Sequence, residues 1–340
     1  MQELLDWCRF LRLDNALLSI GGPLIGAIAQ NPSLPVWQAL ALAAVGMCAH
    51  VHGFVLNDVM DWELDSMNPA KRGKPLLNGF MAKRSALLVA WIQLPMALAL
   101  GAIPPAASLG SELLLVLSCA FATIYNLYGK RFPAAPVIAD ACLGSSVGTI
   151  VIWGAVVTEG KASPLVIAIA IYIVVQLALI NMLMGLQDLG HDLAFGARTS
   201  SIWLGARPGS DAKPQVSNPL RSYTMVVAFA VNLFLEATLL ANLWGLSADT
   251  VRLVSLAWLL ISSVSVFSLI WYLWINSLQV LLQVYYDLGY VSLLVMLGAR
   301  AGAQTMVCLF AIVSIPVVIT YPAKLWARYA ARQQARTARR

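Results

Sequence analysis

The stretch VWQALALAAVGMCAHVHGFVLNDVMDWELDSMNPAKRGKP, residues 36–75, passes abruptly from an apolar run to a concentration of charge. Its first part, residues 36–57, has the length and composition of a helix that crosses a lipid bilayer. Its second part carries four carboxylates and then three basic residues: Asp58, Asp61, Glu63, Asp65, Lys71, Arg72 and Lys74. The stretch therefore predicts a membrane helix that leads into a charged site.

The rest of the chain repeats the apolar part of this pattern. Its 340 residues are 60% hydrophobic and 11% charged, with a mean hydropathy of +0.77, whereas a soluble domain carries about 25% charged residues. The predicted spans are residues 14–30, 36–57, 85–104, 111–128, 136–157, 164–187, 222–243, 252–275, 278–299 and 303–322. We therefore expect an all-α fold, a polytopic transmembrane helical bundle of nine to ten spans, with residues 1–340 forming a single integral-membrane domain.

Basic residues orient this bundle. Loops on one side collect most of the lysines and arginines, whereas the short connections on the other side, up to residue 251, contain only Lys161. The basic side is predicted to be cytoplasmic, and the polar loops 58–84 and 188–221 both lie on it. The basic C-terminal stretch favours ten crossings, although it could instead lie along the membrane surface. Segment 278–299 is polar for a lipid-facing helix, which leaves nine crossings as the alternative.

Six of the sixteen acidic residues gather in two short windows on the predicted cytoplasmic side. Asp58, Asp61 and Asp65 are spaced i, i+3, i+7, and Asp188 and Asp192 are spaced i, i+4. Each set would share one face of a helix, where like charges repel and are costly to desolvate. Hard oxygen ligands of this kind suit Mg²⁺, which binds through one or two carboxylates together with phosphate oxygens of a substrate.

Basic residues near the two windows complete the pattern. Lys71, Arg72, Lys74, Lys130 and Arg131 are suited to holding phosphate charge. The sequence therefore predicts a Mg²⁺–diphosphate site at the cytoplasmic rim, with a lipid tail running into the bundle. Solvated loop charges that only set the topology are the alternative, which two clusters on one side disfavour. Glu63 falls on a different helix face and is expected to be a bystander.

Three motifs resemble those of one known family. NDVMDWELD (residues 57–65) fits the NDxxDxxxD signature of the UbiA superfamily of intramembrane prenyltransferases. DLGHDLAFGARTSSIWLG (188–205) resembles the second aspartate motif of that family, and YNLYGKR (125–131) resembles its Tyr-plus-Lys/Arg connection. The resemblance covers nearly the whole chain. It implies helices around a central cavity, with two Mg²⁺ ions held between the aspartate motifs and an isoprenyl diphosphate.

The resemblance and the charge pattern together assign roles to individual residues. The expected metal ligands are Asp58, Asp61, Asp65, Asp188 and Asp192, and all of these except Asp65 are also expected to be catalytic. The expected substrate-binding residues are Asn57, Lys71, Arg72, Lys74, Tyr125, Lys130, Arg131 and Arg198. Two positions depart from the family pattern, because Lys74 stands where arginine is usual and Gln187 where asparagine is common.

The function that the resemblance implies is Mg²⁺-dependent transfer of an isoprenyl group from its diphosphate to a lipophilic or aromatic acceptor, through an allylic carbocation. A terpene cyclase that uses the same ionisation without an acceptor is the alternative, and a cation transporter is a more remote one. The expected partners are the two substrates and the lipid bilayer, with no nucleic acid. The sequence leaves the donor length and the acceptor open.

A few polar residues in or near the predicted spans have no role in these motifs. His50 and His52 are expected to make packing or polar contacts, and His191 to touch diphosphate or face solvent. Asp140 lies inside the fifth predicted span and is either paired with Lys130 or Arg131 or part of a functional site.

Overall fold

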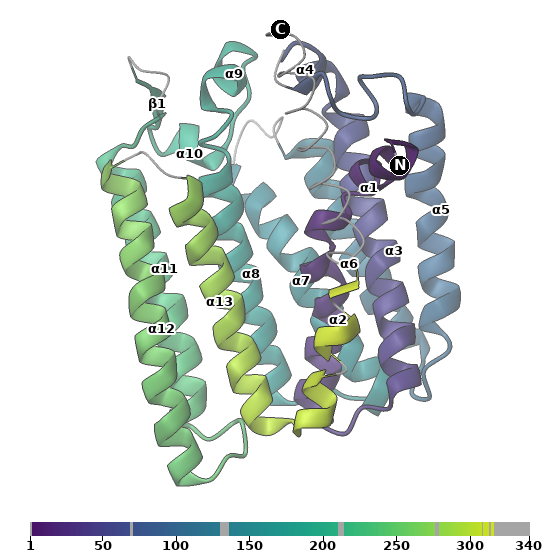
Figure 1. The fold of residues 1–340 in the computed structure, drawn as a ribbon, viewed down its shortest axis with the longest axis vertical. Coiled ribbons are helices and arrows are strands. Elements are labelled where there is room, and N and C mark those ends of the chain that lie inside the picture. The colour runs from purple at the N-terminus through teal and green to yellow at the C-terminus, as the bar shows by residue number, and fades with distance from the viewer. Residues whose placement is uncertain are drawn as a thin grey trace, which may run out of the picture.

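Long helices run side by side through the protein, and short elements gather at one end (Figure 1). The structure is a computed structural model that describes residues 2–68, 71–129, 136–209, 214–275, 279–307, 309–312 and 314–315. The short elements are α1 (Gln2–Phe10), η1 (Leu13–Asn15), α4 (Trp62–Ser66), α9 (Leu189–Ala194), α10 (Ser200–Trp203), and the antiparallel pair β1 (Arg207–Pro208) and β2 (Pro214–Gln215). We call this end of the bundle the polar end.

Nine long helices are described. They are α2 (Ala16–Gln30), α3 (Val36–Met60), α5 (Lys83–Gly101), α6 (Leu109–Tyr128), α7 (Pro136–Glu159), α8 (Pro164–Met184), α11 (Asn218–Leu240), α12 (Ala248–Ile275) and α13 (Gln279–Arg300). Each begins and ends near the boundaries of a predicted span, because the proline, glycine and polar breaks in the sequence interrupt the apolar runs where the chain turns.

Seven of these helices, within the part of the chain that is described, are long and apolar enough to cross a membrane: α3, α5, α6, α7, α8, α11 and α12. α2 has 15 residues and is shorter than such a span, although most of it is buried in the bundle. Residues 303–307 and 309–312 are helical, but the predicted span 303–322 continues beyond the described residues. The count of nine to ten crossings therefore stays a prediction.

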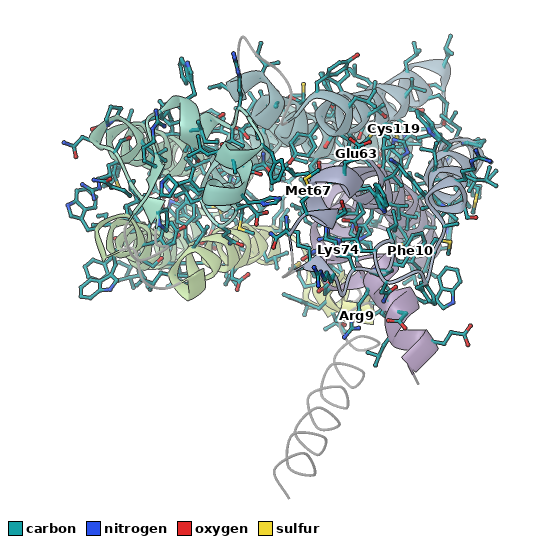
Figure 2. All side chains as sticks on the ribbon, turned by 90° about the horizontal axis from the view of Figure 1, so that it is seen from above. Arg9, Phe10, Glu63, Met67, Lys74 and Cys119 are labelled. Carbon is teal, nitrogen blue, oxygen red and sulfur yellow. The ribbon has the colours of Figure 1, made fainter. Side chains whose placement is uncertain are left out.

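Large apolar side chains cover the outside of the bundle. Leu113 on α6, Leu233 on α11 and Leu260 on α12 have exposed fractions of 59%, 66% and 63%. A surface of this kind is unfavourable in water and favourable against lipid tails. The chain is therefore an integral membrane protein. Seen from above, Lys74 lies inward of Arg9 and of α1, which sits at the margin (Figure 2).

Glycines bring the backbones of α2 and α7 into direct contact. A Cβ atom added to Gly26 would lie 1.8 Å from the carbonyl oxygen of Val151, and one added to Gly154 would lie 2.1 Å from that of Pro23. Small residues at helix crossings are a main source of close packing in membranes, where the hydrophobic effect does not draw helices together. This contact packs α2 directly against α7 inside the bundle.

Gly154→Ala tests this close crossing. The added methyl group would meet the backbone of Pro23, so we expect the free energy of unfolding to fall by about 1–3 kcal/mol, measured by thermal or denaturant unfolding in detergent. Gly53→Ala is the matched control, because a Cβ added at this position in α3 has no heavy atom within 4 Å. Equal effects of the two substitutions would contradict the proposed crossing.

Candidate active site

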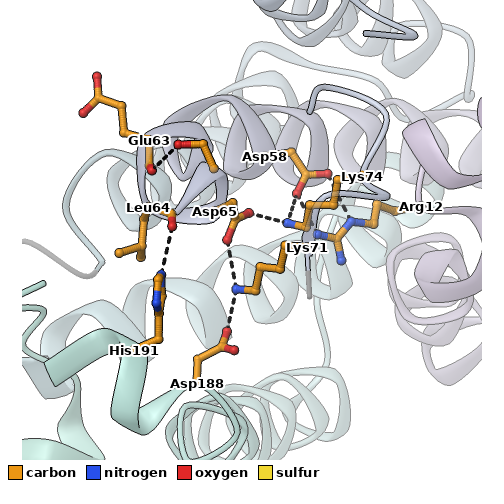
Figure 3. Close-up of polar contacts among 10 residues, drawn as sticks. Arg12, Asp58, Glu63, Leu64, Asp65, Lys71, Lys74, Asp188 and His191 are labelled. Carbon is orange, nitrogen blue, oxygen red and sulfur yellow. Dashed lines mark hydrogen bonds and ion pairs between the residues drawn. The ribbon is translucent and has the colours of Figure 1, made fainter. Parts of the chain in front are cut away.

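Lys74 joins the first and last aspartates of the first acidic window (Figure 3). Its Nζ lies 2.7 Å from Oδ1 of Asp58 and 2.5 Å from Oδ2 of Asp65. The predicted continuous helix is wrong in one detail, because α3 ends at Met60 and α4 begins at Trp62. The backbone N–H of Asp65 still donates to the carbonyl of Asp61 at 2.8 Å across this break. The predicted common side of Asp58 and Asp65 is therefore preserved.

Arg12 is a member of the site that sequence reasoning missed. Its Nη2 lies 2.7 Å from Oδ1 of Asp58, and its Nε lies 3.2 Å from Oδ2, so the guanidinium holds both carboxylate oxygens. Two-point pairing of this kind is stronger and more directional than a single contact. In the sequence, Arg12 looks like an ordinary basic residue before a span, and only its contact with a residue 46 positions away reveals the role.

The backbone of Arg12 adopts a left-handed conformation that residues other than glycine rarely take, with φ 51° and ψ 37°. Such a backbone conformation costs of order 1–3 kcal/mol and persists only where its surroundings hold it. His50 supplies part of that support, since its Nε2 lies 3.0 Å from the carbonyl oxygens of both Leu11 and Arg12, and its Nδ1 lies 3.2 Å from Oγ of Ser19. The expected polar contact of His50 is thus confirmed, and it positions Arg12.

Two contacts tie the second acidic window to the first. Nζ of Lys71 lies 2.9 Å from Oδ1 of Asp65 and 2.7 Å from Oδ2 of Asp188. His191 donates from Nε2 to the carbonyl oxygen of Leu64 at 2.9 Å (Figure 3). His191 therefore links α9 to α4, and its expected contact with diphosphate stays a prediction. The two windows, far apart in the sequence, form one site.

The pairings keep the charged groups ionised. Burial by itself would raise the pKa of the Asp65 carboxyl, but hydrogen bonds and the charges of Lys74 and Lys71 hold that pKa below its ordinary value. Burial would likewise lower the pKa of Lys71, but hydrogen bonds and charges from Asp188 and Asp65 raise it. The pKa of Arg12 is also raised, because Asp58 outweighs the effect of burial. The site is therefore an ion-pair network in which positive and negative side chains alternate.

A cavity of about 300 Å³ opens beside this ion-pair network. The predicted site residues that line it are Asn57, Asp61, Lys71, Lys74, Tyr125, Asp188 and Asp192, and Arg12 lines it as well. Asp58 and Asp65 are instead buried beneath the basic groups that pair with them. Of the three predicted metal ligands that line the cavity, Asp192 is itself buried, with an exposed fraction of 1%. The cavity combines these carboxylates with cations that are within reach of a bound anion.

Not every predicted substrate-binding residue reaches this cavity. Arg72 and Arg198 are exposed, and they are not among the described residues that line it. Lys130 and Arg131 lie outside the described residues. The expected contacts of these four residues with diphosphate stay predictions. The expected pairing of Asp140 with Lys130 or Arg131 also stays a prediction.

The carboxylate oxygens of the site are suitable ligands for Mg²⁺. In this structure, however, lysine side chains occupy positions between them. Among the residues that the structure describes, no three His, Cys, Asp or Glu side chains converge closely enough to bind a metal ion. The reason is visible in Figure 3, where Lys74 lies between Asp58 and Asp65, and Lys71 between Asp65 and Asp188. All five acids offer oxygen ligands, so metal binding by the buried pair requires the lysines to turn away.

Asp140 has well-defined partners beneath the carboxylates. Asn181 donates from Nδ2 to Oδ1 of Asp140 at 2.6 Å, and Ser200 donates from Oγ to Oδ2. The hydroxyl of Tyr125 donates to Oδ1 of Asn181 at 2.9 Å. The four side chains come from α6, α7, α8 and α10 and all line the cavity. The sequence marks Asp140 and Tyr125 as candidates, but nothing in the motifs indicates Asn181 or Ser200 as their partners.

Comparisons with known proteins identify related sequences and folds. A family model described as the UbiA prenyltransferase family matches residues 19–266. A digeranylgeranylglyceryl phosphate synthase of Methanoculleus marisnigri is 28% identical over 205 residues, which are 58% of this chain and 68% of that protein. The chain spans about two thirds of the length of the curated relatives that it matches.

Two solved structures share the fold. A UbiA homolog from Aeropyrum pernix K1 superposes with a TM-score of 0.63 at 20% identity, covering 82% of this chain and 96% of that one. A UbiA homolog from Archaeoglobus fulgidus, solved bound to GPP and Mg²⁺, superposes with a TM-score of 0.63 at 15% identity, covering 91% of this chain and all 100% of that one.

Replacing Arg12 tests its pairing with Asp58. In metal-free buffer, Arg12→Met leaves the buried Asp58 carboxylate with Lys74 alone, and we expect the free energy of unfolding to fall by about 1–3 kcal/mol. Arg9→Met is the matched control, because Arg9 is half exposed and its ion pair with Asp6 is long, at 3.5 Å. That variant should change stability by less than about 0.5 kcal/mol. An equal loss in both variants would contradict the pairing.

Acid titration tests the lysine pairs of Asp65. Because its folded-state pKa lies below the ordinary value of 3.8, the ionised carboxylate stabilises the folded protein above that pH. The stabilisation is lost as the pH falls through the folded-state pKa. We expect the Tm difference between the wild type and Asp65→Asn to be constant near neutrality and to shrink in acid. A difference that stays constant to about pH 3 would refute the lowered pKa.

Proposed function

The chain belongs to the UbiA prenyltransferase family, and on this premise we propose that it transfers an isoprenyl group from an isoprenyl diphosphate to a lipophilic or aromatic acceptor, with Mg²⁺ as cofactor. The observation that carries the proposal is the Lys71 bridge between Asp65 and Asp188, which unites two distant acidic windows beside a cavity. We propose that the bundle acts as one catalytic domain with its site on the cytoplasmic side, and the basic loops at that end support this orientation.

The five carboxylates fall into two groups that differ in whether they line the cavity. Asp61, Asp188 and Asp192 line the cavity, whereas Asp58 and Asp65 are covered by Lys74 and other basic groups. The Archaeoglobus fulgidus homolog was solved with Mg²⁺ and GPP bound, which supports binding of Mg²⁺ together with an isoprenyl diphosphate here. When bound, Mg²⁺ acts as a Lewis acid that stabilises charge on the leaving diphosphate. All five aspartates are proposed as its ligands.

The basic residues take part through an exchange of partners. Nζ of Lys71 and Nζ of Lys74 each hold two carboxylates, and both side chains line the cavity. A lysine that gives up a carboxylate can swing to a phosphate oxygen without crossing apolar surroundings, since its ammonium is a compact charge on a flexible stem. The guanidinium of Arg12 is placed to bind anionic oxygen in the same way.

The reaction follows from these contacts. The C–O bond at the allylic carbon breaks, and the diphosphate leaves with the electron pair, stabilised by the surrounding positive charge. An electron pair of the acceptor then forms the new bond to the allylic cation, and the acceptor loses a proton to the diphosphate or to water. The apolar bundle holds the isoprenyl tail and keeps water from the cation.

A direct assay tests this function. Purified protein in lipid or detergent is incubated with Mg²⁺ and a radiolabelled C15 or C20 diphosphate, with and without an acceptor. A glyceryl phosphate lipid is the first acceptor to try, because the curated relatives are digeranylgeranylglyceryl phosphate synthases. Acceptor-dependent product that disappears with a chelator supports the proposal. A cyclised product formed without an acceptor would replace it with a cyclase.

Two substitutions test the cavity-facing acids. Asp61→Asn and Asp192→Asn each remove one carboxylate charge from the cavity, and we expect kcat/KM to fall by about 100-fold or more, with a higher Mg²⁺ requirement. Glu63→Gln is the matched control, because Glu63 is an exposed neighbour in the same window. It should retain activity within about threefold. Equal losses in all three variants would argue against the assigned roles.

A further inference from the structure

A directed chain of hydrogen bonds lies beneath the carboxylates. It runs from Tyr125 on α6 through Asn181 on α8 to Asp140 on α7, where Ser200 of α10 also donates. Asp140 and Ser200 are nearly fully buried, with exposed fractions of 7% and 2%. All four side chains line the cavity beside Asp61. The metal and diphosphate contacts proposed above do not use Asp140, Asn181 or Ser200.

The acceptor at the end of this chain sets its direction. Both oxygens of Asp140 receive hydrogen bonds, from Asn181 and from Ser200, which is the pattern of an ionised carboxylate. Asn181 must therefore turn its NH₂ group toward Asp140, and its carbonyl oxygen faces Tyr125. The phenol has one proton, and it donates that proton to Asn181 at 2.9 Å.

The consequence concerns the side of Tyr125 that faces the cavity. With its proton committed to Asn181, the phenol oxygen has only lone pairs left for a bound substrate. An oriented oxygen of this kind, in a site that excludes water, stabilises positive charge that develops nearby. We infer that Asp140 is a positioning residue that, through Asn181, makes Tyr125 present an electron-rich oxygen to the allylic cation. This inference rests on the proposed prenyl transfer.

Asp140→Asn removes one of the two acceptor oxygens that set the direction of the chain, with little change of shape, and so allows the chain to reverse. The new amide can donate to Asn181, which then turns its own NH₂ group toward Tyr125. The phenol accepts that hydrogen bond and points its proton into the cavity, where it opposes a cation. A purely structural Asp140, which only ties α7 to α8 and α10, would instead lower stability without a selective effect on turnover.

Kinetics separate these two roles. We expect Asp140→Asn to lower kcat by about 10- to 100-fold, with KM for the diphosphate within about threefold of the wild type, because the cation forms only in the transition state. In a Tyr125→Phe background, the same substitution should have no further effect. Additive losses in the double variant would overturn the inference, and so would an unchanged kcat in folded Asp140→Asn protein. Asn181→Leu removes the side chain that connects Asp140 to Tyr125. It should lower kcat in the wild type and have no further effect on kcat in the Tyr125→Phe background.

A spectroscopic measurement reads the hydrogen bond without substrate or metal. In protein carrying ring-labelled tyrosine, the phenol C–O stretch of Tyr125 is identified as the infrared band that disappears in Tyr125→Phe. Asp140→Asn should shift this band in the direction expected when a phenol changes from donor to acceptor, and an unshifted band would overturn the inference. A wild type that turns over no diphosphate would refute the proposed function, whereas this band still decides whether Asp140 orients Tyr125.

Discussion

The repulsion among five carboxylates at one end of an apolar bundle is the constraint on which the rest of this structure depends. Unpaired charges so close to lipid would be costly. Three basic side chains lower that cost for three of the five by pairing across the site: Arg12 with Asp58, Lys74 with Asp58 and Asp65, and Lys71 with Asp65 and Asp188. These pairings determine how the loop after α3 folds back over the bundle and why the segment before α2 is drawn to the site.

The same pairings link stability to function. An internal cation that neutralises a carboxylate in one state can hold a phosphate in another, because lysine and arginine pair with either anion. The cost of assembling the acids is thus met by groups that the proposed reaction also needs. In the bundle below, the glycine contacts of Gly26 and Gly154 bring the backbones of α2 and α7 together.

Much of the fold was predictable because its signals are local. The apolar runs have the length of membrane spans, and α2 to α13 begin and end close to the polar or proline-containing breaks. The i, i+7 spacing also placed Asp58 and Asp65 on one side, which their shared contact with Lys74 confirms. The interruption of the helix after Met60 was missed, since the sequence there shows no proline or glycine to mark it.

By itself, the sequence determined the fold class, the end of the bundle that carries the charge, and the kinds of chemical group gathered there, because hydropathy and residue spacing act along the chain. The tertiary structure alone decided which cation meets which carboxylate. Arg12 reaches Asp58, His191 reaches Leu64, and Asn181 turns its amide between Tyr125 and Asp140. These contacts join residues from 41 to 127 positions apart, and only the packing of the helices brings such partners within hydrogen-bonding distance.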